Sequence, residues 1–94
     1  MVKDTTVRGV LLAAARLIER KGWCQGAGTD ARGRHCLMGA LNEVGTIRGI
    51  DRARTALMRQ FPGSFVTTWN DEPWRTKKQV LTALRTAARA PRPR

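Results

Sequence analysis

Acidic residues are scarce in this chain, and none of them follows Arg75. The 94 residues include 7 Asp and Glu against 18 Lys and Arg, which gives a formal net charge of +11 at pH 7. Residues 75–94 carry seven basic side chains and no acid. A positive field of this kind favours nucleic acid, an anionic membrane or an acidic protein as the partner, without deciding among them.

Long hydrophobic runs are also missing. The longest run, Val10–Ala15, has six residues, whereas a membrane-spanning helix needs about 20. Arg16 then ends that run before it could form the core of a signal peptide. Cys24 and Cys36 are too few for a secreted disulfide scaffold, so we expect two free thiols. The sequence therefore predicts a cytoplasmic protein that does not bind a membrane.

Apolar side chains recur at helical spacing in several segments, which predicts a mainly α fold. We expect a compact single domain of about four helices over residues 1–90, followed by a flexible basic tail over residues 91–94. The predicted helices cover residues 5–21, 36–44 and 51–61, and a final segment that begins at Thr76.

Local signals mark where the helices begin and where the chain turns. Asp51 is expected to cap the third helix, and Thr76 with Gln79 predicts a capping box at the start of the last one. Glycines after the first helix allow a short β-hairpin near Trp23. Residues 64–68 are β-prone, although the segment is short for a strand.

Several short strings stand in a set order along the chain. They are Ala14-Ala15-Arg16-Leu17-Ile18-Glu19-Arg20-Lys21-Gly22-Trp23, Gln25-Gly26, Cys36-Leu37-Met38-Gly39-Ala40-Leu41, Trp69-Asn70-Asp71, Arg75-Thr76 and Gln79-Val80-Leu81. In this order they resemble a family of small uncharacterised proteins from actinobacteria and their phages. The resemblance extends over residues 11–88. It implies a compact, mainly helical domain and such a source, but no activity.

One group of residues could carry cysteine chemistry. Cys36 stands at the start of a predicted helix, a position that activates a thiol. His35 could act as its base, and Asn70 or Asp71 could orient the imidazole. Adjacent residues point their side chains in different directions, however, so the spacing of His35 and Cys36 speaks against a catalytic pair. A small cysteine-dependent enzyme is therefore the least favoured of three hypotheses, after the two binding functions described below.

The same segment could also ligate a metal ion. Cys24, His35 and Cys36 offer three ligands, and Asp30 or Asp71 could supply a fourth. Structural zinc sites usually pair their ligands about two to four residues apart, and the only close pair here is adjacent. We therefore expect no metal and no cofactor, and a binding protein rather than an enzyme.

Two groups of basic side chains form the predicted surface for nucleic acid or an acidic host macromolecule. One lies on the last helix, and the other belongs to a variant helix-turn-helix built from the second and third helices, with Gly49 lengthening its turn. The first group is Arg75, Lys78, Arg85 and Arg89, and the second is Arg48, Arg52 and Arg54.

Residues 69–74 predict a turn and suggest a second hypothesis, a module that docks on a host protein and inhibits or redirects it. The residues concerned are Trp69, Asn70, Asp71 and Trp74. Aromatic side chains anchor many such interfaces. In the plain structural interpretation, Trp69 and Trp74 brace the last helix and Asp71 pairs with Arg75.

Overall fold

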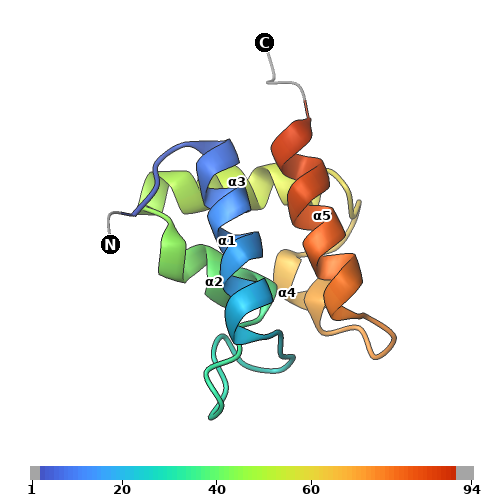
Figure 1. Cartoon of the computed structure of the whole chain (residues 1–94). Helices are drawn as coiled ribbons and strands as arrows, with labels where there is room; N and C mark the ends of the chain where they lie inside the picture. The colour runs from blue at the N-terminus through green and yellow to red at the C-terminus, as the bar shows by residue number, and fades with distance from the viewer. Residues whose placement is uncertain (1–2, 91–94) are drawn as a thin grey trace.

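The computed structural model describes residues 3–90, which form five helices, three of which pack against α1 (Figure 1). In chain order the helices are α1 (Val7–Lys21), α2 (Leu37–Val44), α3 (Ile47–Met58), α4 (Val66–Asn70) and α5 (Lys77–Arg89). The predicted mainly α fold is confirmed, with one short helix more than expected. The predicted basic tail lies outside the described residues. No helix in residues 3–90 has both the length and the apolar character needed to cross a bilayer.

The core lies where α1 packs against α2, α3 and α5. On α1, the buried residues Leu11, Ala14 and Ile18 recur at helical spacing and form one apolar stripe. The largest apolar side chains that are fully buried are Leu11, Ile18, Leu37, Leu41, Leu57 and Leu84. These side chains come from four helices, and α1 packs against each of the other three.

Four of the helices begin with the same kind of cap. The side chains of Thr6, Cys36, Thr46 and Thr76 each accept a hydrogen bond from the backbone N–H three residues later, at 3.0 to 3.2 Å. At α5 the side chain of Gln79 also accepts from the backbone N–H of Thr76, at 3.1 Å, which confirms the predicted capping box. These bonds satisfy donors that a helix start leaves without an internal partner.

The start of α3 differs from the prediction. The helix begins at Ile47 behind its Thr46 cap, so the expected cap at Asp51 is wrong. Gly49, expected to lengthen the preceding turn, lies inside the helix. A Cβ atom on Gly49 would lie 2.8 Å from the backbone oxygen of Asp4. This glycine therefore serves close packing of α3 against the N-terminal segment.

The segment after α3 also differs from the prediction. Of the β-prone residues 64–68, the last three belong to α4, which is a single helical turn. The bridges within residues 3–90 are isolated, so no neighbouring strand is available for pairing. Packing decides instead. Val66 is buried, and Trp69 stacks on Phe61 with 4.4 Å between ring centroids. The turn also carries Asn70 into the interior, where it is fully buried.

Residues 22–36 form an irregular loop held by isolated bridges, which is one of the two conformations that the sequence allows for this segment. Trp23 pairs with His35 in a parallel bridge, and Thr29 pairs with the same residue in an antiparallel one. Gly22, with a φ of 103°, turns the chain away from the end of α1. In Figure 1 this loop lies at the end of α1 that is remote from the N-terminus.

Candidate functional site

Arginine side chains from three helices gather around one surface hollow. The hollow has a volume of about 960 Å³ and lies between the start of α1, one face of α3 and the end of α5. We call it the arginine groove. Its charged lining residues are Arg8, Arg48, Arg52, Arg59, Arg89 and Asp51. Five positive charges thus face one negative charge.

The face of α3 supplies most of these charges. Arg48 and Arg52 belong to α3 and Arg59 is its C-cap, and their spacings of four and seven residues place all three on the same side of the helix. All five groove arginines are exposed, and no ion pair within residues 3–90 involves any of them. The single acid, Asp51, is already engaged, because its carboxylate accepts a hydrogen bond from Arg54 at 2.5 Å. The groove therefore presents cations whose charge no neighbouring carboxylate neutralises.

The position of Arg48 opposes the local electrostatics of the helix. Arg48 is the second residue of α3, and the first turn of that helix contains no acid. The N-terminal end of a helix carries partial positive charge, so a cation there is unfavourable. Arg52 lies four residues later and adds like-charge repulsion. Asp51, three residues after Arg48, offsets part of this cost, although its carboxylate already accepts a hydrogen bond from Arg54.

The predicted basic stripe on the last helix is dispersed in the structure. Arg75 precedes α5, and its guanidinium carbon lies 3.7 Å from the centroid of the Trp69 ring. Arg85 forms an ion pair with Glu19 of α1. Lys78 is exposed outside the groove, so Arg89 alone joins Arg48 and Arg52 there. Among the predicted residues, Arg54 faces Asp51 rather than the groove.

Two groove residues, Arg8 and Arg59, were not predicted. Arg59 follows Arg52 by seven residues within the predicted helix 51–61. This helical spacing is a sequence signal that places the two side chains on one face. Arg8 comes from a different helix, and only the packing of α1 against α3 brings it to the groove.

Asn70 organises the opposite end of the molecule. Its Oδ1 accepts hydrogen bonds from Trp23 Nε1 at 2.7 Å and from the backbone N–H of Leu37 at 3.0 Å. Its Nδ2 donates to the backbone oxygen of Cys24 at 3.2 Å and to Asp71 Oδ1 at 2.9 Å. This one amide joins α4, the 22–36 loop and the start of α2, and we call the assembly the Asn70 junction.

The neighbours of Asn70 strengthen the same junction. Gln25 Nε2 donates to the backbone oxygens of Asn70 at 3.0 Å and Glu72 at 2.8 Å. The backbone N–H of Gly26 donates to Asp71 Oδ1 at 3.1 Å. The expected Asp71–Arg75 pair is therefore wrong, because Asp71 holds the 22–36 loop instead.

The two tryptophans of the predicted docking turn have different environments. Trp69 is partly buried and contacts both the ring of Phe61 and the guanidinium of Arg75, whose Nε also donates to the Trp69 backbone oxygen at 2.9 Å. Trp74 is 66% exposed. The prediction that both rings brace the last helix thus fails for Trp74, whose ring largely faces solvent.

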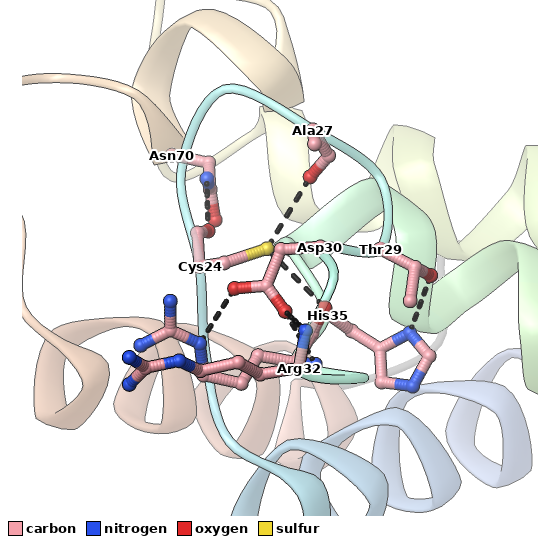
Figure 2. Close-up of polar contacts among 8 residues, drawn as sticks. Cys24, Ala27, Thr29, Asp30, Arg32, His35 and Asn70 are labelled. Carbon is pink, nitrogen blue, oxygen red and sulfur yellow. Dashed lines mark hydrogen bonds and ion pairs between the residues drawn. The ribbon is translucent and has the colours of Figure 1, made fainter.

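The geometry around Cys24 and His35 does not assemble a catalytic pair. Figure 2 shows the Cys24 sulfur facing the backbone oxygen of Ala27, at 3.4 Å, and His35 Nδ1 facing the Thr29 hydroxyl, at 3.0 Å. Burial, and then the nearby charge of Asp30, raise the pKa of the Cys24 thiol. A thiol that stays protonated is a poor nucleophile.

The remaining polar groups of this segment hold the loop together. The Cys36 sulfur accepts a hydrogen bond from the backbone N–H of Gly39 and caps α2. Partial burial alone would raise the pKa of Asp30, but hydrogen bonds from the backbone and side chain of Arg34, and from the backbone of Arg32, lower it. No group of three potential metal-ligating side chains comes together within the described part of the chain.

Comparison with known proteins identifies a family. No curated protein and no solved structure matches the chain significantly. A family model described as a family of unknown function, DUF6197, matches residues 2–90. Because this match includes nearly every residue of the helical domain, the chain belongs to the DUF6197 family.

Proposed function

We propose that the chain is a small, non-enzymatic nucleic-acid-binding protein and that the arginine groove is its binding surface. The observation that supports this proposal is the convergence of five exposed arginines from α1, α3 and α5 on one hollow. The guanidinium group presents a rigid fork of donors that matches a phosphate group. Several such forks in one hollow suit a ligand with several phosphates.

An acidic protein would also complement the charge, but the groove favours nucleic acid. Protein interfaces usually gain most of their affinity from large aromatic or aliphatic anchors. Apart from its arginines, its threonines and Asp51, the groove lining within residues 3–90 consists of Val7 and four alanines. Phosphate contacts need no such anchors, because the release of counterions supplies much of the affinity.

The position of Arg48 gives independent support. A cation at the start of α3 weakens the helix, yet Arg48 lines the groove. Residues that oppose stability are common where a protein binds or reacts. A bound phosphate would remove the conflict by neutralising both the side chain and the positive end of the helix.

We place this activity in the cytoplasm of an actinobacterium or of a cell infected by its phage. The source is the one that the resemblance implies. Both cysteines are free and buried, which fits a reducing compartment. Host or phage nucleic acid is then the abundant polyanion available to the groove.

A pair of matched double variants tests the proposal. Arg48→Ala with Arg52→Ala removes two charges from the groove, whereas Arg16→Ala with Arg20→Ala removes two exposed charges from α1 outside it. We expect the groove variant to bind labelled DNA at least about tenfold more weakly at low salt, and the control to lose no more than about threefold. Fluorescence anisotropy gives both affinities.

Either of two results would contradict the proposal. Equal losses in the two double variants would show that overall charge, rather than the groove, holds the ligand. If the unmodified protein bound neither single-stranded nor double-stranded nucleic acid at low salt, the nucleic-acid function itself would be wrong. Circular dichroism melts of both variants would show that the fold is retained.

Docking on a host protein is the second candidate, and one observation favours it. Trp74 is 66% exposed, and Phe65 at the start of α4 is 71% exposed. Asn70 and Trp69, by contrast, are engaged inside the molecule and offer little to a partner. A host protein captured from nuclease-treated lysate, and lost on Trp74→Ala, would support this function. Capture that disappears with nuclease would support nucleic-acid binding.

A further inference from the structure

We infer that the arginine groove takes a single strand of nucleic acid by its phosphates, rather than a duplex. This inference rests on the proposed function and specifies its ligand. It depends on three properties of the groove, which are its shape, the spacing of its arginines and the chemistry of the side chains between them.

The shape of the groove disfavours a duplex. A helix that reads double-stranded DNA projects into a major groove about 12 Å wide. The arginine face of α3 is instead one wall of a hollow, with the start of α1 and the end of α5 as the other walls. Figure 1 shows these two ends beside α3, at the same end of the molecule. A volume of about 960 Å³ lies within the range of small-ligand pockets, roughly 300–1,000 Å³.

The spacing of the arginines suits a short run of consecutive phosphates. With a rise of about 1.5 Å per residue, Arg48 and Arg52 are separated by about 6 Å along α3, and Arg52 and Arg59 by about 10 Å. Arg8 and Arg89 add donors from the other walls. A thin strand lying in the hollow can be contacted from several sides, whereas a duplex could present only the edge of one strand.

The lining offers bases no surface on which to stack. Within residues 3–90, no aromatic side chain lines the groove. No Asn or Gln lines it either, and these are the side chains that pair best with adenine edges. Ala56, Ala87, Ala88 and Thr55 also belong to the lining. The strand is therefore held mainly by its backbone, and base contacts are limited to those that arginine and threonine can make.

A direct comparison of strands tests this inference. The ligands are a labelled single strand of about 12 nucleotides and the duplex of the same sequence, a length within the usual footprint of single-strand binding modules. We expect the single strand to bind at least about fivefold more tightly at low salt. The logarithm of its binding constant should fall with the logarithm of salt concentration with a slope of about −3, since each of four or five phosphates contributes about −0.7.

The possible results separate this inference from the function on which it rests. Duplex binding that equals or exceeds single-strand binding would overturn the inference and leave nucleic-acid binding intact. Failure of both ligands to bind would overturn both. Preference of more than about tenfold between two single strands of unrelated sequence would show base reading and would also overturn it. Arg8→Ala and Arg59→Ala, on different walls, should each reduce the slope by about 0.7.

Discussion

The arginine groove and the Asn70 junction lie toward opposite ends of α1, a helix about 22 Å long, and they use polar groups in opposite ways. In the junction, donors and acceptors meet one another, and in residues 3–90 every buried side-chain nitrogen and oxygen has a hydrogen-bond partner. In the groove, five exposed arginines face one acid that is already paired. One end satisfies its polar groups internally, whereas the other presents exposed cations that the proposed anionic ligand would neutralise.

This difference assigns separate roles to the strings noted in the sequence. Trp23, Gln25, Asn70 and Asp71 belong to strings that carry the family resemblance, and all four bond within the junction. Their role in the structure is to fasten the loop and α4 to α2. The groove arginines belong to none of those strings. A motif can thus identify a fold while the proposed binding surface lies elsewhere.

The most severe disruption of the junction should come from Gly39→Ala. A Cβ atom on Gly39 would lie 2.0 Å from the backbone oxygen of Gly28. Neither α2 nor the 22–36 loop can move away from this contact without opening the loop. We expect a loss of more than about 4 kcal/mol in the free energy of unfolding, or no folded protein. Urea denaturation measures the loss.

The same contact provides its own control. A Cβ atom on Gly28 would find its nearest neighbour, Gly39 Cα, at 3.9 Å, an ordinary contact. Gly28→Ala should therefore change stability by no more than about 0.5 kcal/mol. Comparable losses for the two variants would mean that the loop does not approach α2 as closely as the structure shows.

A smaller but still large loss is expected for Asn70→Asp. The change is almost isosteric, but it replaces the Nδ2 donor by an oxygen that faces the Cys24 backbone oxygen and the Asp71 carboxylate. Because the position is fully buried, we expect a loss of about 3 kcal/mol in the free energy of unfolding. Nucleic-acid affinity of the remaining folded protein should be unchanged.

The exposed Asn42 of α2 is the matched control for this change. Asn42→Asp introduces the same charge on the surface and should alter stability by less than about 0.5 kcal/mol. If Asn70→Asp were equally mild, the junction would not depend on the amide donor.

A substitution in the groove is expected to have a small effect on stability, and it should raise rather than lower the free energy of unfolding. Arg48→Glu places an acid in the first turn of α3 and opposite Arg52 at the next turn, both of which are favourable, but it also sets that acid three residues before Asp51, which is unfavourable. We expect the free energy of unfolding to rise by no more than about 0.5 kcal/mol while the affinity for single-stranded DNA falls. Arg48→Gln should give an intermediate result in both measurements. A loss of stability would show that Arg48 has a structural partner and would weaken the contrast between the two ends.

Sequence reasoning succeeded where the determining signals are local. The capping box of Thr76 and Gln79 and the apolar spacing of α1 need no distant partner, so α1 and α5 were predicted close to their observed bounds. It failed where packing overrides local preference. Gly49 looks like a turn residue but meets the Asp4 backbone inside a helix, and Val66 looks like a strand residue but is buried by a single helical turn.

The candidate site was predicted only in part for the same reason. Arg48, Arg52 and Arg89 were singled out for their charge, and the structure brings them together. Arg75 and Arg85 were chosen on the same ground, but Trp69 and Glu19 engage them. Charge along a sequence does not reveal which cations acquire an internal partner, because those partners come from other helices.

The two cysteines have a consequence for the kinetics of the junction. Cys24 and Cys36 are only 6% and 5% exposed, and both lie where the 22–36 loop meets its neighbours. A thiol-specific reagent in solution reaches them when this end of the molecule opens, so their labelling rate reports the frequency of opening events. The labelling rates of these two thiols therefore measure how often the Asn70 junction opens, whereas no cysteine lines the groove within residues 3–90.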